Sequence, residues 1–169
     1  MSAIPPEAYR RWFDYEKDAH AKTMASLTAV PADKRETPQF RRAVDLMAHV
    51  LGTRWLWLER LGGTTTRPLK MYPKELPFAD LPMRVTEMET AWSPYLGRLT
   101  DADLAHSVEW GAADGPRFTN TVEDILTQLF GHSTYHRGQI ALLLRQIACQ
   151  PPATEFIYFT RRPAGSAPG

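Results

Sequence analysis

Two histidines, His132 and His136, stand four residues apart in the run GHSTYHRGQI. Residues at this spacing on a helix bring their side chains within about 5–6 Å, so both imidazoles can bind one ion. A third histidine, His49, lies inside the apolar run LMAHVLGTRWLWLERLGG. Three neutral imidazoles suit zinc, nickel, iron(II) or copper and leave positions open for water or substrate. We therefore predict an open metal site made by His49, His132 and His136; histidines with a purely structural role are the alternative.

The periodicity of the last long helix places the histidine pair toward the interior. A helix from about Val122 to Ile147 has its inward positions in alternating steps of three and four: Val122, Ile125, Leu129, His132, His136, Gln139, Leu143 and Ile147. A buried polar group without a partner costs about 1–3 kcal/mol. We therefore expect a ligand, a water network or a metal beside this stripe.

Two common patterns of metal enzymes do not fit these residues. A zincin protease needs glutamate directly after its first histidine, where this chain has Ser133. A di-iron bundle needs Glu-x-x-His on two helices, and no such pair occurs near either histidine run. The single cysteine, Cys149, excludes an internal disulfide, and we expect it to fill space at a helix end rather than to catalyse.

Several residues one turn from the histidines are candidates to orient them. Metal-bound histidines usually donate their other ring N–H to a carboxylate, amide or carbonyl. Asp45, Gln128 and Gln139 stand at suitable spacings, although Asp45 is equally well placed to be a solvated charge. Gly52 leaves room either for a ligand or for close helix packing.

The remaining basic residues are assigned to the surface rather than to the site. Arg54, Arg137 and Arg145 have the right chemistry to hold an anionic substrate, but a place on the helix surface is the favoured interpretation. His20 lies among polar residues of the first helix and His106 lies in an expected hairpin, so neither is assigned to the site.

Proline, capping and glycine signals predict four long helices to position these side chains. Their expected ranges are about 5–30, 37–62, 80–99 and 122–147. The segment 62–81 has no sustained period and predicts a long surface crossover, while LAHSVEW and GPRFTN favour a minor β-hairpin. After Cys149, the run PPATEFIYFTRR predicts an extended strap with its aromatic residues on the helices, and RPAGSAPG a flexible tail.

Composition excludes several classes of partner. The 169 residues fit one domain, and 20 lysines and arginines against 19 acidic residues predict no nucleic-acid partner. No apolar run approaches the roughly 20 residues that span a bilayer, and the N-terminus lacks the apolar core of a signal peptide. We therefore expect a soluble cytoplasmic protein without a membrane partner.

Both histidine runs, LMAHVLGTRWLWLERLGG and GHSTYHRGQIALLLRQ, together with PPATEFIYFTRR, resemble the DinB/YfiT-like superfamily along nearly the whole chain. The resemblance implies an all-α four-helix bundle with a long crossover between helices two and three. It also implies one metal-binding histidine on helix two and an HxxxH pair on helix four, which correspond to His49, His132 and His136. The expected organisation is one DinB-like domain over residues 1–160 with a flexible C-terminal tail at 161–169.

The resemblance also implies a class of chemistry. The superfamily includes thiol-dependent S-transferases and a mycothiol-dependent isomerase, in which a divalent metal binds a small thiol as thiolate. This chain is then expected to be a metalloenzyme that uses zinc, nickel or iron and a low-molecular-weight thiol on a small-molecule ligand. The alternative is a non-catalytic metal-binding or stress-response protein. A homodimer is expected because some family members are dimers and five tryptophans supply apolar area.

Overall fold

Proline and threonine residues determine where the long helices of the computed structural model begin. Three of these helices carry proline in their first two positions, where its missing N–H and fixed φ are no disadvantage. The Thr37 hydroxyl oxygen accepts a hydrogen bond from the Phe40 N–H at 3.3 Å and so caps the second helix. The structure describes residues 4–111 and 114–164. Within them the four long helices are α1 (Pro6–Thr28), α2 (Pro38–Arg60), α3 (Leu81–Gly97) and α5 (Val122–Gln146).

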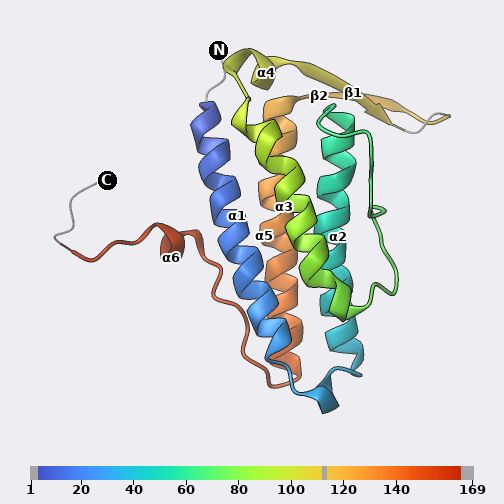
Figure 1. Ribbon diagram of the computed structural model, residues 1–169, viewed down its shortest axis with the longest axis vertical. Coiled ribbons are helices and arrows are strands. Elements are labelled where there is room, and N and C mark those ends of the chain that lie inside the picture. The colour runs from blue at the N-terminus through green and yellow to red at the C-terminus, as the bar shows by residue number, and fades with distance from the viewer. Residues whose placement is uncertain (1–3, 112–113, 165–169) are drawn as a thin grey trace.

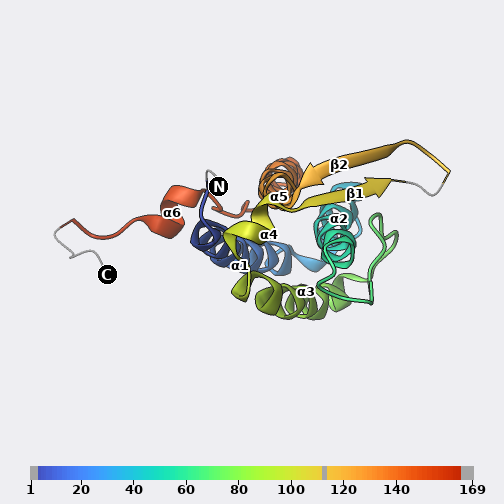
Figure 2. The same ribbon diagram turned by 90° about the horizontal axis from the view of Figure 1, so that it is seen from above.

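The four long helices run side by side, as Figures 1 and 2 show. Helix α2 packs against α3 and α5, and α1 packs against the same two helices. The core between them is apolar and includes Phe13, Met47, Met88, Trp92 and Leu129. The predicted mostly helical fold with a small sheet is confirmed.

The crossover from α2 to α3 runs outside the helices and also packs against them (Figure 1). Its Leu69 side chain is buried in the core. A Cβ added at Gly52 would lie 2.1 Å from the Lys70 carbonyl oxygen, so this glycine lets the crossover backbone approach α2. Short 3-10 helices, η1 (Ala32–Lys34) and η2 (Phe78–Asp80), precede α2 and α3.

The predicted hairpin is confirmed and lies across one end of the helices (Figure 1). Strands β1 (Ser107–Gly111) and β2 (Arg117–Thr121) pair antiparallel, with Ser107 opposite Thr121. Thr121 ends β2 and caps α5, because its hydroxyl accepts from the Asp124 N–H at 3.1 Å while the Asp124 carboxylate accepts from the Thr121 N–H at 3.0 Å. A five-residue helix, α4 (Asp101–Ala105), precedes β1; it is too short to show a period in the sequence.

The C-terminal segment differs from the predicted extended strap. It forms a short helix, α6 (Phe156–Thr160). Its aromatic side chains do pack on α1, since the rings of Tyr15 and Phe156 lie 5.1 Å apart, and the Tyr15 hydroxyl donates to the Thr154 carbonyl. Most of the predicted flexible tail, residues 165–169, lies outside the described residues. The division into residues 1–160 and 161–169 therefore stays a prediction.

Crossing a membrane requires a helix that is both long enough and apolar enough. None of the helices within residues 4–111 and 114–164 meets both conditions.

Candidate metal centre

The histidine pair of α5 lies at the edge of the core rather than in its middle. The predicted inward stripe is correct through Leu129, and beyond that point the buried side chains shift by one position to Ser133, Arg137, Ile140 and Leu144. His132, His136 and Gln139 are half-buried. The predicted burial of the pair is therefore corrected: both imidazoles lie where α5 meets α2, partly open to solvent.

His49 lies on α2 and is buried as predicted, with 8% of its surface exposed. Its Nδ1 atom is 2.7 Å from the Met71 carbonyl oxygen in the crossover. A carbonyl oxygen only accepts, so Nδ1 carries the proton and the lone pair of neutral His49 is on Nε2. Met71, rather than the predicted Asp45, orients this ring. Gly52 makes the contact feasible by admitting the backbone of residues 70–71.

His136 is oriented by its own helix. Its Nδ1 atom is 2.7 Å from Gln139 Oε1, and Gln139 Nε2 donates to the Tyr135 hydroxyl at 3.1 Å. The amide thus presents its oxygen to the imidazole, which keeps the proton on Nδ1 and the lone pair on Nε2. The role expected for Gln139 agrees with this contact.

The three Nε2 atoms converge on one point. His132 Nε2 lies 3.1 Å from His49 Nε2 and 3.1 Å from His136 Nε2. The ligand atoms of the three residues all lie within 4.8 Å of one another. Two of these nitrogens present lone pairs, and neutral His132 has at most one proton to place between them. At least one close nitrogen–nitrogen contact therefore has no proton between its two nitrogens, an arrangement that a bound cation stabilises.

The environment favours the neutral form of His132 and His136, which is the form that binds metals. Burial, together with the neighbouring imidazoles of His136 and His49, lowers the pKa of His132 to about 4. Burial also lowers the pKa of His136. Because metal ions compete with protons for imidazole nitrogen, lowered pKa values favour ion binding at neutral pH.

Two exposed tyrosines border the histidine cluster. The Tyr72 ring stacks on His49, with centroids 4.6 Å apart and planes 6° apart. Tyr135 lies beside His136, with centroids 5.1 Å apart. On the side of His132 lies a cavity of about 670 Å³ between α2, α5 and the hairpin. This cavity gives a small molecule access to the cluster.

A buried ion cluster lies behind the histidines, and the sequence analysis did not predict it. The Glu16 carboxylate of α1 accepts from Arg54 of α2 at 2.6 Å and from Arg137 of α5 at 2.7 Å. All three side chains are almost fully buried, so the predicted surface positions of both arginines are wrong. One carboxylate thus joins the two helices that carry the histidines.

The charges of this cluster compensate one another. Burial raises the pKa of Glu16, but the cations Arg54 and Arg137 outweigh that effect and hold the pKa below its usual value.

His20, which the sequence places among polar residues of the first helix, is fully buried, with its Nδ1 atom 2.9 Å from Glu89 Oε1. A detectable signal was Arg54, a charged residue inside the apolar run LMAHVLGTRWLWLERLGG.

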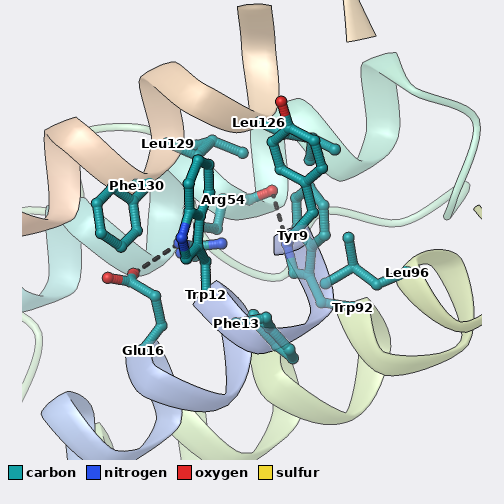
Figure 3. A pocket seen from close by; sticks show the side chains of 10 residues that line it. All are labelled: Tyr9, Trp12, Phe13, Glu16, Arg54, Trp92, Leu96, Leu126, Leu129 and Phe130. Atoms are coloured by element: carbon teal, nitrogen blue, oxygen red, sulfur yellow. Dashed lines mark hydrogen bonds and ion pairs between the residues drawn. The ribbon is translucent and has the colours of Figure 1, made fainter. Parts of the chain in front are cut away.

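The cavity beside this ion cluster is too small for a substrate. Figure 3 shows Glu16 and Arg54 among aromatic and aliphatic side chains, with the carboxylate directed at the guanidinium. The volume of this cavity, about 20 Å³, corresponds to one water molecule. The larger cavity next to His132 is the better candidate for ligand binding.

The family profile described as the DinB family matches residues 6–164, which include all three histidines and the residues that orient them. A comparison with curated proteins gives no match.

Proposed function

The chain belongs to the DinB family, and on that premise we propose that His49, His132 and His136 bind a divalent metal ion through their Nε2 atoms. The observation that carries this proposal is the convergence of three Nε2 atoms while two of the rings have Nδ1 committed to the Met71 and Gln139 oxygens. Three imidazole nitrogens suit zinc, nickel or iron(II).

We further propose that the site is catalytic and transfers a low-molecular-weight thiol to a small electrophile. Three protein ligands leave coordination positions open, and the cavity beside His132 supplies room for a reactant. A bound divalent ion supplies Lewis acidity that lowers the pKa of a thiol and so favours the thiolate. The protein holds the His49 and His136 imidazoles in one tautomer and partly shields the site with Tyr72.

A fluorogenic thiol assay tests the proposed activity. Protein loaded with zinc or nickel is incubated with monochlorobimane and glutathione, bacillithiol or mycothiol, so that the sulfur forms a C–S bond and displaces chloride. We expect a metal-dependent rate above the uncatalysed rate with at least one thiol. The rate should be lost in His132→Ala and kept in His106→Ala, since His106 is exposed in the part of the structure away from the cluster.

The absence of metal-dependent turnover with every thiol would contradict thiol transfer. If the ion still binds under those conditions, the protein is a non-catalytic metal-binding member of its family. The assay therefore separates the two functions that the sequence left open.

A further inference from the structure

The cavity beside His132 has chemically distinct ends. His132 and Met71 line it near the metal centre, and Trp57, Trp110 and Arg60 line it toward the hairpin. Its volume of about 670 Å³ lies in the usual range of small-molecule sites. A ligand that fills it touches the metal centre at one end and a cation at the other.

Arg60 has no carboxylate partner among the residues that the structure describes. Its guanidinium carbon lies 4.9 Å from the ring centroid of Trp57 and 5.3 Å from that of Trp110. Within residues 4–111 and 114–164 no carboxylate reaches it at ion-pair distance, because the adjacent Glu59 pairs with Arg67 at 3.7 Å. Burial, followed by repulsion from Arg67, lowers the pKa of Arg60. An anion bound here would therefore compensate a partly desolvated charge.

The acidic residue at the cavity is engaged elsewhere. Asp124 also lines the cavity, but its Oδ2 atom accepts from the Thr121 N–H at 3.0 Å and from the Thr121 hydroxyl at 2.8 Å. These bonds lower the pKa of Asp124 and keep its charge on the helix cap. Of the two charged side chains that line the cavity, Asp124 is therefore held by the helix cap, and the guanidinium of Arg60 is the one left to pair with a ligand.

The walls next to Arg60 are flat and apolar. The indoles of Trp57 and Trp110 meet edge to face, with centroids 5.4 Å apart. Trp110 Nε1 donates to Asn120 Oδ1 at 2.9 Å, which fixes the orientation of that ring. Leu56 and Leu129 continue the apolar surface toward His132. Such walls favour an aromatic or similarly planar body.

Helix geometry indicates the extent of the cavity along α5. Asp124 and His132 line the cavity from the same helix and are separated by eight residues, which corresponds to about 12 Å at the rise of an α-helix. A single aromatic ring with a short side chain and a terminal carboxylate approaches this span.

We propose that the cavity binds the substrate as an elongated, planar organic anion. Its carboxylate pairs with Arg60, its body packs against Trp57 and Trp110, and its other end lies beside the histidines. The last of these contacts rests on the proposed metal function, whereas the first two involve only the cavity.

Calorimetric titration with cinnamate and its neutral analogue cinnamamide tests this proposal. The two probes have the same planar body and differ in charge. We expect wild type to bind cinnamate about ten-fold more tightly, as expected for roughly 1.4 kcal/mol of charge-assisted pairing. Arg60→Gln should remove this preference, and Arg41→Gln, a matched change of an exposed arginine on the same helix outside the cavity, should keep it. Trp110→Ala should weaken the binding of both probes.

Titrations of chelator-treated and zinc-loaded protein separate Arg60 from the metal as the source of the preference. A preference for cinnamate that needs zinc and survives in Arg60→Gln would overturn the proposal, and so would equal binding of both probes to wild type. Zinc content of the same samples is measured by elemental analysis. Failure to bind zinc would contradict the metal function, and loss of the charge preference alone would contradict only the anion site.

Discussion

His49 and His136 each commit Nδ1 to a protein oxygen, which leaves Nε2 as the ligand atom. The Met71 carbonyl and the Gln139 amide provide these oxygens at 2.7 Å. Such outer contacts fix the tautomer and the orientation of the ring before an ion arrives, and they raise the basicity of the ligand. The affinity of the centre therefore depends on residues that do not touch the ion.

Replacing Gln139 by alanine should weaken ion binding. The substitution removes the acceptor of His136 Nδ1, and loss of such a contact typically costs about 10–100-fold in affinity. Competition with a chromophoric zinc chelator measures the change. Gln146→Ala is the matched control at the end of the same helix, because Gln146 is exposed and does not line the cavity. Equal affinities of the two variants would show that the amide does not orient the ligand.

Glu16→Gln should strongly destabilise the fold. It leaves the buried cations Arg54 and Arg137 without their shared carboxylate, and breaking a buried pair in this way costs about 3–5 kcal/mol. Urea denaturation gives the free energy of unfolding. The control is Asp14→Asn on the same helix, which loses only an exposed pair with Lys17 and should cost under about 1 kcal/mol. A similar cost for both variants would contradict the bridging role of Glu16.

At the scale of elements, the sequence predicted where helices begin and end better than which side faces the core. Capping residues act locally, so Thr37 and Thr121 mark the starts of α2 and α5 in the sequence. The predicted inward face of α5 was wrong after Leu129, because burial of Arg137 depends on Glu16, a partner on another helix. The three histidines of the cluster were identifiable from residue type and spacing, whereas the contact with Met71 arises from the path of the crossover.

Gly52→Ala should weaken the metal centre through the crossover. Its new Cβ would lie 2.1 Å from the Lys70 carbonyl oxygen, so the backbone of residues 70–71 must move and the bond from His49 to Met71 is lost. We expect zinc affinity to fall by about 10–100-fold. Gly138→Ala is the matched control, since nothing lies within 4 Å of its added Cβ, and a helical alanine should stabilise by about 0.5–1 kcal/mol. Unchanged zinc affinity in Gly52→Ala would argue against this coupling.

At the scale of the whole molecule, one buried carboxylate holds three helices together. Glu16 on α1 reaches Arg54 on α2 and Arg137 on α5, and α2 and α5 carry the histidines of the cluster. Its pKa is lower in the folded chain than the ordinary value of 4.5. Ionised Glu16 therefore stabilises the fold above the pKa of an unfolded glutamate, and this contribution is lost as the pH falls through the folded value.

The stability difference between wild type and Glu16→Gln should accordingly shrink on acidification. It should be full at neutral pH and decrease below the ordinary glutamate pKa of 4.5 as the carboxylate takes up a proton. Denaturation curves of both proteins across this range give the difference. A difference that does not change with pH would show that the charge of Glu16 does not contribute.

Metal content most directly tests the central claim that His49, His132 and His136 form one site. Wild type and His49→Ala are loaded with zinc, dialysed together and examined by elemental analysis, with His106→Ala as the exposed-histidine control. We predict one zinc ion per chain in wild type and in His106→Ala, and a large loss in His49→Ala. Equal zinc content in wild type and His49→Ala would contradict the three-histidine centre.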